Sequence, residues 1–293
     1  MNQSAETGSP TLSSHCARIL SCGDLATKLA GIPGDTPDLP EPGPRPPDRP
    51  ARNPEIAMQP GSDPLPKPRD PHDPKARARC LARFAHHELV AVELLAWALL
   101  RWPQMPPGLR GMLAFTLGEE QNHCRLYLER LRDHGERLAD HPQSDYFWRQ
   151  VAGIENSGAG PRAFLAALGL TLEQANLDFS LVYRDAFRIA GDEATAQVCQ
   201  RVHDDEIGHV RAAATWLERL SAEASTDLGA YLDAVPFPLC LARAKARRFD
   251  AAARRKAGLS EEFIEAVRGA RSTQESGIPA KPGNTQPANA SRT

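Results

Sequence analysis

The sequence predicts an all-α fold built around a four-helix bundle. Apolar residues recur at helical intervals through residues 75–222, and the connections between the expected helices run short, long, short. Two Glu-x-x-His patterns also lie deep inside two of these helices. With 293 residues, of which 41% are hydrophobic, the chain is long and apolar enough to bury a core. A leading segment and a trailing segment are expected to flank the bundle.

Residues 1–74 are predicted to form a short helical segment followed by a proline-rich stretch. Apolar residues at helical intervals between Cys16 and Leu29 indicate a short helix or a pair of helices. The stretch from Gly31 to Pro74 is crowded with proline, which disfavours helix and central strand. We therefore expect this stretch to be extended or disordered, as a tether or as a strap over the domain surface.

The first two helices of the bundle are predicted to form a hairpin. The first runs from Lys75 to Arg101, and its second half is apolar on all sides, which is typical of a buried helix. Trp102-Pro103 ends it. The second begins after Pro106-Pro107, because proline is favoured in the first helical turn, and it ends near His134, where Gly135 supplies the cap.

The other two helices are predicted to form a second hairpin. The irregular stretch from Glu136 to Gly160 is too long for a tight turn and is interpreted as a crossover. A third helix from Pro161 to Ala190 is followed by a turn at Gly191-Asp192 and by a fourth helix that ends near Ala222. This loop order is that of a ferritin-like four-helix bundle.

Residues 223–268 are predicted to form a C-terminal helical extension that packs on the bundle. The region from Tyr231 to Leu241, which contains Pro236-Phe237-Pro238, is expected to be irregular, and a basic helical stretch from Ala242 to Ala257 follows it. A short amphipathic helix from Glu261 to Val267 closes the ordered part. The tail, residues 269–293, is rich in Ser, Gly, Pro and Asn and is expected to be disordered.

The overall composition does not favour a nucleic-acid or membrane partner. The formal net charge is −2, and no run of about 18 apolar residues is present. The N-terminus lacks the basic-then-apolar order of a signal peptide, so we expect a soluble, cytoplasmic protein with no membrane contact. The cysteines are scattered without a Cys-x-x-Cys pair, so reduced thiols are expected.

The two Glu-x-x-His patterns are the strongest functional signal. Glu120 and His123 form the first, and Glu206 and His209 form the second. Residues three apart share a helix face, so each pattern aims a carboxylate and an imidazole at the same point. One such pair alone is more often an exposed ion pair than a metal site, whereas two pairs can hold two metal ions.

Matched glutamates on the remaining two helices complete the pattern. Glu88 lies 32 residues before Glu120, and Glu173 lies 33 residues before Glu206. In a helical hairpin, residues that far apart reach the same height when each lies about 15 residues from the turn. A dinuclear carboxylate site in a four-helix bundle uses one Glu from each of two helices and a Glu-x-x-His from each of the others. The metal-ligand set is therefore predicted as Glu88, Glu120, His123, Glu173, Glu206 and His209.

Four further residues are candidates for an outer role at this site. Glu93 competes with Glu88, but the stripe around Glu88 is apolar throughout, whereas the Glu93 stripe reaches Arg101; we favour Glu88 and keep Glu93 as an alternative ligand. Glu119 and Asp205 directly precede the ligand glutamates and could hydrogen-bond a histidine on a neighbouring helix. An ordinary polar role is favoured for His203, with ligation as the alternative.

Several motifs resemble the DUF455 family of ferritin-like proteins. They are Phe84-Ala85-His86-His87-Glu88-Leu89-Val90-Ala91-Val92-Glu93-Leu94, Leu172-Glu173-Gln174-Ala175, Asp204-Asp205-Glu206-Ile207-Gly208-His209-Val210 and Pro236-Phe237-Pro238-Leu239. The resemblance covers most of residues 75–268. It implies a ferritin-like bundle with a dinuclear iron centre at the six predicted ligands, and it implies no substrate.

The residues and the resemblance together favour a non-haem dinuclear iron oxidoreductase that activates O₂ or peroxide. Carboxylate oxygens with few imidazoles suit two iron ions, and manganese is the alternative metal. The expected partners are an unknown small-molecule substrate and, for an oxygenase, a separate electron-transfer reductase. The alternatives are an iron-binding or iron-detoxifying protein without an organic substrate, a tRNA-modifying hydroxylase and a metal-free interaction module.

RNA is the less favoured partner because the chain is not basic overall. The candidate contact is a basic stretch near the C-terminus, in which a solvated helix surface is the favoured interpretation. Its members are Arg243, Lys245, Arg247, Arg248, Arg254, Arg255 and Lys256.

Overall fold

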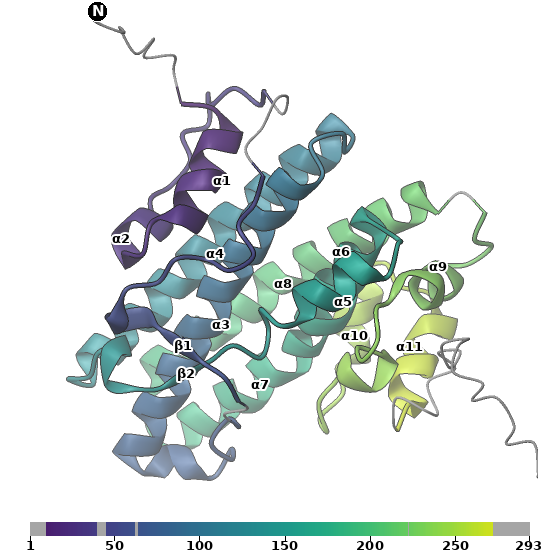
Figure 1. Cartoon of the computed structure of the whole chain (residues 1–293). Helices are drawn as coiled ribbons and strands as arrows, with labels where there is room; N and C mark the ends of the chain where they lie inside the picture. The colour runs from purple at the N-terminus through teal and green to yellow at the C-terminus, as the bar shows by residue number, and fades with distance from the viewer. Residues whose placement is uncertain (1–9, 40–44, 62–63, 222, 272–293) are drawn as a thin grey trace, which may run out of the picture.

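The protein is all-α in the computed structural model, which describes residues 10–39, 45–61, 64–221 and 223–271. Four long helical segments run beside one another, and the N-terminal and C-terminal helices lie on opposite sides of them (Figure 1). No helix in the described ranges is long and apolar enough to cross a membrane. Residues 1–9 and the C-terminal tail from residue 272 on lie outside the described residues. The disorder expected for the tail therefore stays a prediction.

The first hairpin has the predicted boundaries to within a residue. Helix α3 spans Pro74–Arg101 and α4 spans Pro107–Asp133, and the two pack against each other along their length. The Asp73 side chain accepts a hydrogen bond from the Lys75 backbone N–H and thereby caps α3. The short, proline-containing loop between the helices forces them to run antiparallel.

The second hairpin differs from the prediction in its first arm. Helices α6 (Pro161–Ala167) and α7 (Gln174–Ile189) are joined by a π-helical segment, η4 (Leu168–Glu173), so the predicted single α-helix is interrupted. Helix α8 (Glu193–Leu220) packs against this arm after a turn at Gly191, whose φ of 80° favours glycine. A Cβ on Gly169 would lie 2.3 Å from the Cβ of Ala213, so glycine allows η4 to approach α8 closely.

The crossover between the hairpins contains short ordered elements. These are the 3-10 turn η3 (Leu138–Asp140), the two-residue strand β2 (Gln143–Ser144) and the helix α5 (Gln150–Asn156). Strand β2 pairs in parallel with β1 (Met58–Gln59) of the proline-rich segment. This small parallel pair was not predicted, because two residues are too few for a recognisable alternating pattern.

The leading segment forms two short helices and then a strap across α3 and α4. Helices α1 (Leu12–Ser21) and α2 (Leu25–Lys28) are followed by extended chain with two 3-10 turns, η1 (Pro54–Ile56) and η2 (Asp70–His72). Asp38 forms a bidentate ion pair with Arg110 of α4, at 2.7 and 2.8 Å. The strap interpretation therefore describes this region, except that residues 40–44 and 62–63 are outside the described part.

The C-terminal extension is less helical than predicted. Its elements are α9 (Asp227–Ala234), which was not predicted, the 3-10 turn η5 (Leu241–Arg243), α10 (Ala251–Lys256) and α11 (Glu261–Gly269). The expected irregular chain from Tyr231 to Leu241 was wrong at its start, because Tyr231 to Ala234 belong to α9. The expected helix from Ala242 to Ala257 was wrong over its first half, since α10 begins only at Ala251. The Asp178 carboxylate of α7 accepts the backbone N–H groups of Ala246 and Asp250, which draws this segment onto α7 in an irregular conformation.

The core consists of two apolar clusters, one towards each end of the four long segments. Helix α3 contributes residues up to Leu89 to one cluster and residues from Val90 on to the other. Helix α8 likewise changes clusters between Val202 and Ile207. The predicted ligand residues of both helices lie at or next to this change, so the polar site occupies the level between the two apolar regions.

Candidate metal centre

Each Glu-x-x-His pattern brings its two side chains into contact inside the protein. His123 Nδ1 lies 3.2 Å from Glu120 Oε2 on α4, and His209 Nδ1 lies 3.2 Å from Glu206 Oε2 on α8. The two pairs also meet each other, since His209 Nδ1 is 3.0 Å from Glu120 Oε1. All four side chains are buried. The one-turn spacing in the sequence therefore becomes one continuous polar cluster between two helices.

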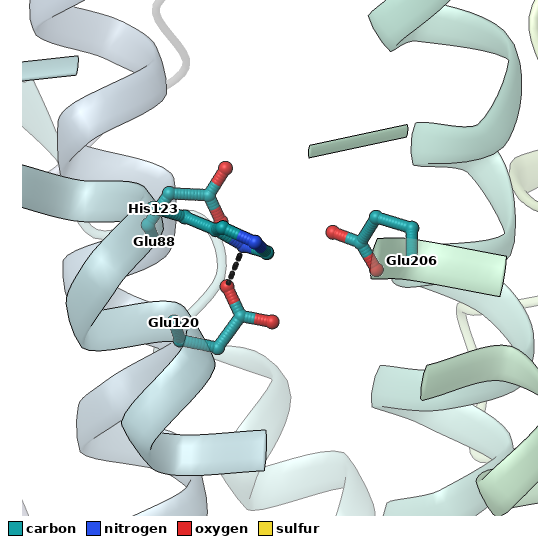
Figure 2. Close-up of side chains that lie close together, drawn as sticks. All are labelled: Glu88, Glu120, His123 and Glu206. Atoms are coloured by element: carbon teal, nitrogen blue, oxygen red, sulfur yellow. Dashed lines mark hydrogen bonds and ion pairs between the residues drawn. The ribbon is translucent and has the colours of Figure 1, made fainter. Parts of the chain in front are cut away.

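The two remaining glutamates join this cluster from the other two long segments. Glu88 of α3 points towards Glu120 and His123, and Glu206 faces them from the opposite helix (Figure 2). Together these four side chains offer ligand atoms that all lie within 4.8 Å of one another. A second group with the same property contains Glu120, Glu173 and His209. The six side chains could therefore hold metal at two adjacent positions, with Glu120 common to both.

An acidic side chain contacts Nε2 of each histidine, on the side of the ring away from the cluster. His123 Nε2 on α4 lies 3.2 Å from Asp205 Oδ2 on α8, and His209 Nε2 on α8 lies 2.9 Å from Glu119 Oε2 on α4. The arrangement is reciprocal, because each helix supplies the acid for the histidine of the other. Such a contact leaves Nδ1 directed at the carboxylate cluster, as in many metal-binding histidines.

The glutamates of the cluster are buried close to one another, and both conditions disfavour their negative charge. Burial, followed by the negative charge of neighbouring glutamates, raises the pKa of Glu88 and of Glu173 well above the ordinary value. Burial acts in the same direction on Glu120, but its contacts with His123 and His209 lower its pKa overall. Burial opposes protonation of His123, yet Asp205 and Glu120 raise its pKa to about 11. In this environment a cation would relieve both the burial and the repulsion of the carboxylates.

Two carboxylate oxygens at the site have no hydrogen-bond partner in the described chain, Oε1 of Glu120 and Oε1 of Glu173. The first still lies 3.0 Å from His209 Nδ1, whereas the second, on a residue that is 8% exposed, has no ion-pair contact among the described residues. Glu173 is the last residue of the π-helical segment, and π-helical segments often occur at functional sites. An unsatisfied buried oxygen on a carboxylate that is close to Glu120 and Glu206 fits a metal-binding role better than a structural one.

A pocket of about 510 Å³ opens onto the carboxylate side of the cluster. Glu88, Glu120, Glu173 and Glu206 line it, whereas His123 and His209 do not. Its remaining walls come mainly from the leading segment, α3, the crossover, η4 and α7, with single residues from α4, α8 and η5. They are mainly apolar and include Leu65, Phe84, Val90, Ala91, Leu94, Phe147, Leu168, Leu172 and Phe179. This volume is in the range of small-molecule sites.

Two of the candidate outer residues lie in other interactions. Both carboxylate oxygens of Glu93 contact cations of the leading segment: Oε1 is 2.9 Å from Lys28 Nζ, and Oε2 is 2.7 Å from Arg52 Nη2. His203 instead contacts Asp204 at 3.1 Å and Asp250 at 3.3 Å. Neither Glu93 nor His203 belongs to the two groups of potential ligands.

Asn176 is a site residue that the sequence interpretation missed. Its side-chain amide donates a 2.8 Å hydrogen bond to Glu206 Oε1, and it lines the pocket. Its position one turn after Glu173 places it on the same helix face, and this spacing could have revealed it. The pocket residues of the crossover, Tyr146 and Phe147, carried no such signal, because no helical period relates them to the predicted ligands.

These features define a helical protein with a buried carboxylate–histidine cluster able to hold metal. Residues 14–265 match the model of a family described as "Protein of unknown function (DUF455)", and the chain belongs to this family. The predicted membership of the DUF455 family is thereby confirmed, whereas the ferritin-like character stays a prediction. Neither the curated proteins nor the solved structures gave a match.

Proposed function

We propose that the protein is a ferritin-like, non-haem dinuclear iron oxidoreductase. The observation that carries this proposal is the position of the pocket, which opens onto four carboxylates of a six-residue cluster. A site that only bound iron would need a path for ions, but it would not need an apolar pocket of this size beside the cluster. For this reason we favour an organic substrate over iron detoxification.

The donor set fits two iron ions. Four carboxylates and two imidazoles are hard and intermediate ligands, which suit iron or manganese, and the two-plus-two arrangement of Glu and Glu-x-x-His is the one used by dinuclear carboxylate sites in bundles. The unsatisfied oxygen of Glu173 and the raised pKa of Glu88 agree with a cation at this place. When bound, the metal ions would supply redox chemistry towards O₂ or peroxide.

The residues of the chain have separable roles in this proposal. Asp205 and Glu119 orient the two imidazoles so that Nδ1 faces the cluster. Asn176 holds one oxygen of Glu206 and leaves the other at the cluster. The apolar pocket wall excludes water from the side on which the substrate would lie. If the reaction is an oxygenation, electrons come from a separate reductase.

Metal analysis followed by oxygen exposure tests the proposal directly. Protein purified without added metal and then loaded anaerobically with ferrous iron is expected to hold about two irons per chain. Exposure to O₂ should change its optical spectrum, and the amount of iron retained should stay at that ratio. A protein that binds no iron would contradict the proposal. Retention of iron in many-fold excess would instead support iron storage.

The acids behind the histidines provide a second test. We expect Asp205→Asn to weaken iron binding by roughly 10- to 100-fold, because His123 loses the group that orients it. Asp204→Asn is the matched control, since this neighbouring side chain is 60% exposed and contacts His203 instead. Anaerobic ferrous titration of the two variants would measure the difference. Equal affinity in the Asp205 variant and the wild type would exclude an orienting role for Asp205.

A further inference from the structure

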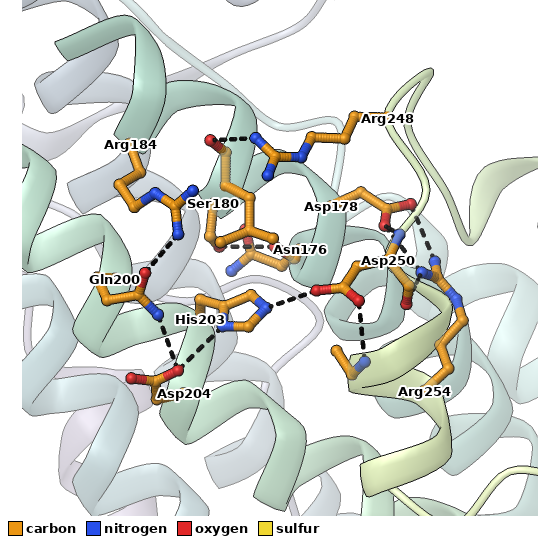
Figure 3. Close-up of polar contacts among 12 residues, drawn as sticks. Asn176, Asp178, Ser180, Arg184, Gln200, His203, Asp204, Arg248, Asp250 and Arg254 are labelled. Atoms are coloured by element: carbon orange, nitrogen blue, oxygen red, sulfur yellow. Dashed lines mark hydrogen bonds and ion pairs between the residues drawn. The ribbon is translucent and has the colours of Figure 1, made fainter. Parts of the chain in front are cut away.

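Most side chains of the basic stretch near the C-terminus form ion pairs or hydrogen bonds within the protein. Arg254 is fully buried and forms a bidentate ion pair with Asp178 at 2.8 and 3.0 Å (Figure 3). Arg248 pairs with Asp185, and Arg255 pairs with Glu261. Lys245 donates to the backbone oxygen of Arg268. These contacts reduce the number of cations available for an external partner such as RNA.

Arg243 is the exception, and it lies at the pocket. Its guanidinium is exposed, lines the pocket and has no hydrogen-bond or ion-pair partner among the described residues. Its backbone is nevertheless held in η5, where its N–H donates to the Cys240 carbonyl at 2.9 Å and the flanking Leu241 and Ala244 are buried. A fixed backbone therefore presents an unengaged cation to the pocket.

The other polar side chains of the pocket have partners or carry no charge. Its second cation, Arg83, donates a hydrogen bond to the Pro142 carbonyl at 3.4 Å. Ser144 donates to the Gly61 carbonyl, Ser180 donates to Asn176, and Tyr183 donates to the Pro66 carbonyl. The His87 ring packs edge-on against Phe147, with the ring centroids 4.6 Å apart. Within the described chain the only acidic side chains that line the pocket are the four of the cluster. No lining acid is therefore left to pair with Arg243.

We propose that the pocket binds an amphipathic organic anion, with its carboxylate or phosphate group on Arg243 and its apolar part in the pocket. This inference rests on the proposed function, because it makes the bound anion the substrate of the metal centre. Arg243, the four glutamates and apolar residues such as Leu172 of η4 line one pocket, so the apolar residues would receive the rest of the molecule. Arg243 is thus a specificity-determining residue.

Calorimetric titration with matched eight-carbon ligands tests this inference. Octanoate, octyl phosphate and octanol share an apolar chain and differ in the end group. We expect an anion to bind the iron-loaded, anaerobic protein about tenfold more tightly than octanol, since a hydrogen-bonded charge pair at a partly exposed site contributes about this factor. Whichever anion binds more tightly identifies the head group. The Arg243→Ala variant should lose this preference.

Arg247→Ala is the matched control, because Arg247 is also exposed and basic but does not line the pocket. It should keep the wild-type preference. Equal binding of all three ligands to the wild type, or an unchanged preference in Arg243→Ala, would overturn the inference. Iron content is measured on the same samples. Wild-type protein without iron would count against the proposed function, while the ligand comparison would still decide whether Arg243 selects anions.

Discussion

Glu120→Ala is expected to abolish tight metal binding at both positions of the cluster. Glu120 is the one residue common to both groups of potential ligands, and it contacts both histidines. Its loss therefore removes a donor from each position at once. Because removal of an outer residue alone typically costs 10- to 100-fold in affinity, we expect a loss of at least about 100-fold for this ligand. Iron content after gel filtration and anaerobic ferrous titration would measure it.

Glu129→Ala is the control for this variant. Glu129 lies on the same helix, is exposed and belongs to neither group of potential ligands. Its replacement should leave the iron content unchanged. Circular dichroism would show whether Glu120→Ala stays helical, since an alanine in place of a buried carboxylate need not destabilise the metal-free protein. Two tightly bound irons per chain in Glu120→Ala would refute the assignment of the site.

The residues of the cluster could be predicted from the sequence because regular helix geometry determines the spacing between them. Helical spacing relates Glu120 to His123, and hairpin geometry relates Glu88 to Glu120, so short-range rules carry a long-range prediction. The structure brings these side chains together at one level, between two apolar clusters. No comparable rule relates Arg243 or Phe147 to the ligands. Their positions depend on how η5 and the crossover pack, and tertiary contacts determine that packing.

The π-helical segment shows a second limit of the prediction. A helical period predicts a continuous helix from Pro161 onwards, and one extra residue per turn over a short stretch is too small a change to detect. Yet this segment sets the direction of Glu173 and lets Gly169 approach Ala213. The place of Glu173 in the cluster was therefore predicted from its register, whereas the local backbone geometry that positions Glu173 was not.

Glu88 and Glu93 illustrate how two similar residues on one helix can have different roles. The choice between them rested on the apolar stripe around Glu88 and on the polar character of the other stripe. The structure shows the origin of that polar character. Glu93 faces the leading segment, where Lys28 and Arg52 bind it, and Arg52 also contacts His86 at 3.2 Å. Glu88 faces the cluster and the pocket.

Glu93→Gln is accordingly expected to destabilise the protein strongly. Glu93 and Lys28 are fully buried and Arg52 is 3% exposed, so the change leaves two cations in the interior without a compensating anion. Burial lowers the pKa of Lys28, and the Glu93 carboxylate opposes that shift, so losing the carboxylate makes the ammonium still harder to keep charged. Breaking one side of a buried ion pair typically costs about 3–5 kcal/mol, a large share of the free energy of unfolding of a domain.

Urea unfolding of metal-free protein would measure this loss, with Glu88→Gln as the matched variant on the same helix. Burial and the neighbouring Glu120 raise the pKa of Glu88 well above its ordinary value, which favours the neutral carboxyl, so a neutral amide should change the free energy of unfolding by no more than about 1 kcal/mol. Iron titration should give the opposite order: Glu88→Gln is expected to lose iron affinity, whereas folded Glu93→Gln is expected to keep it. An unfolding midpoint for Glu93→Gln equal to that of the wild type would show that the leading segment does not depend on this ion pair.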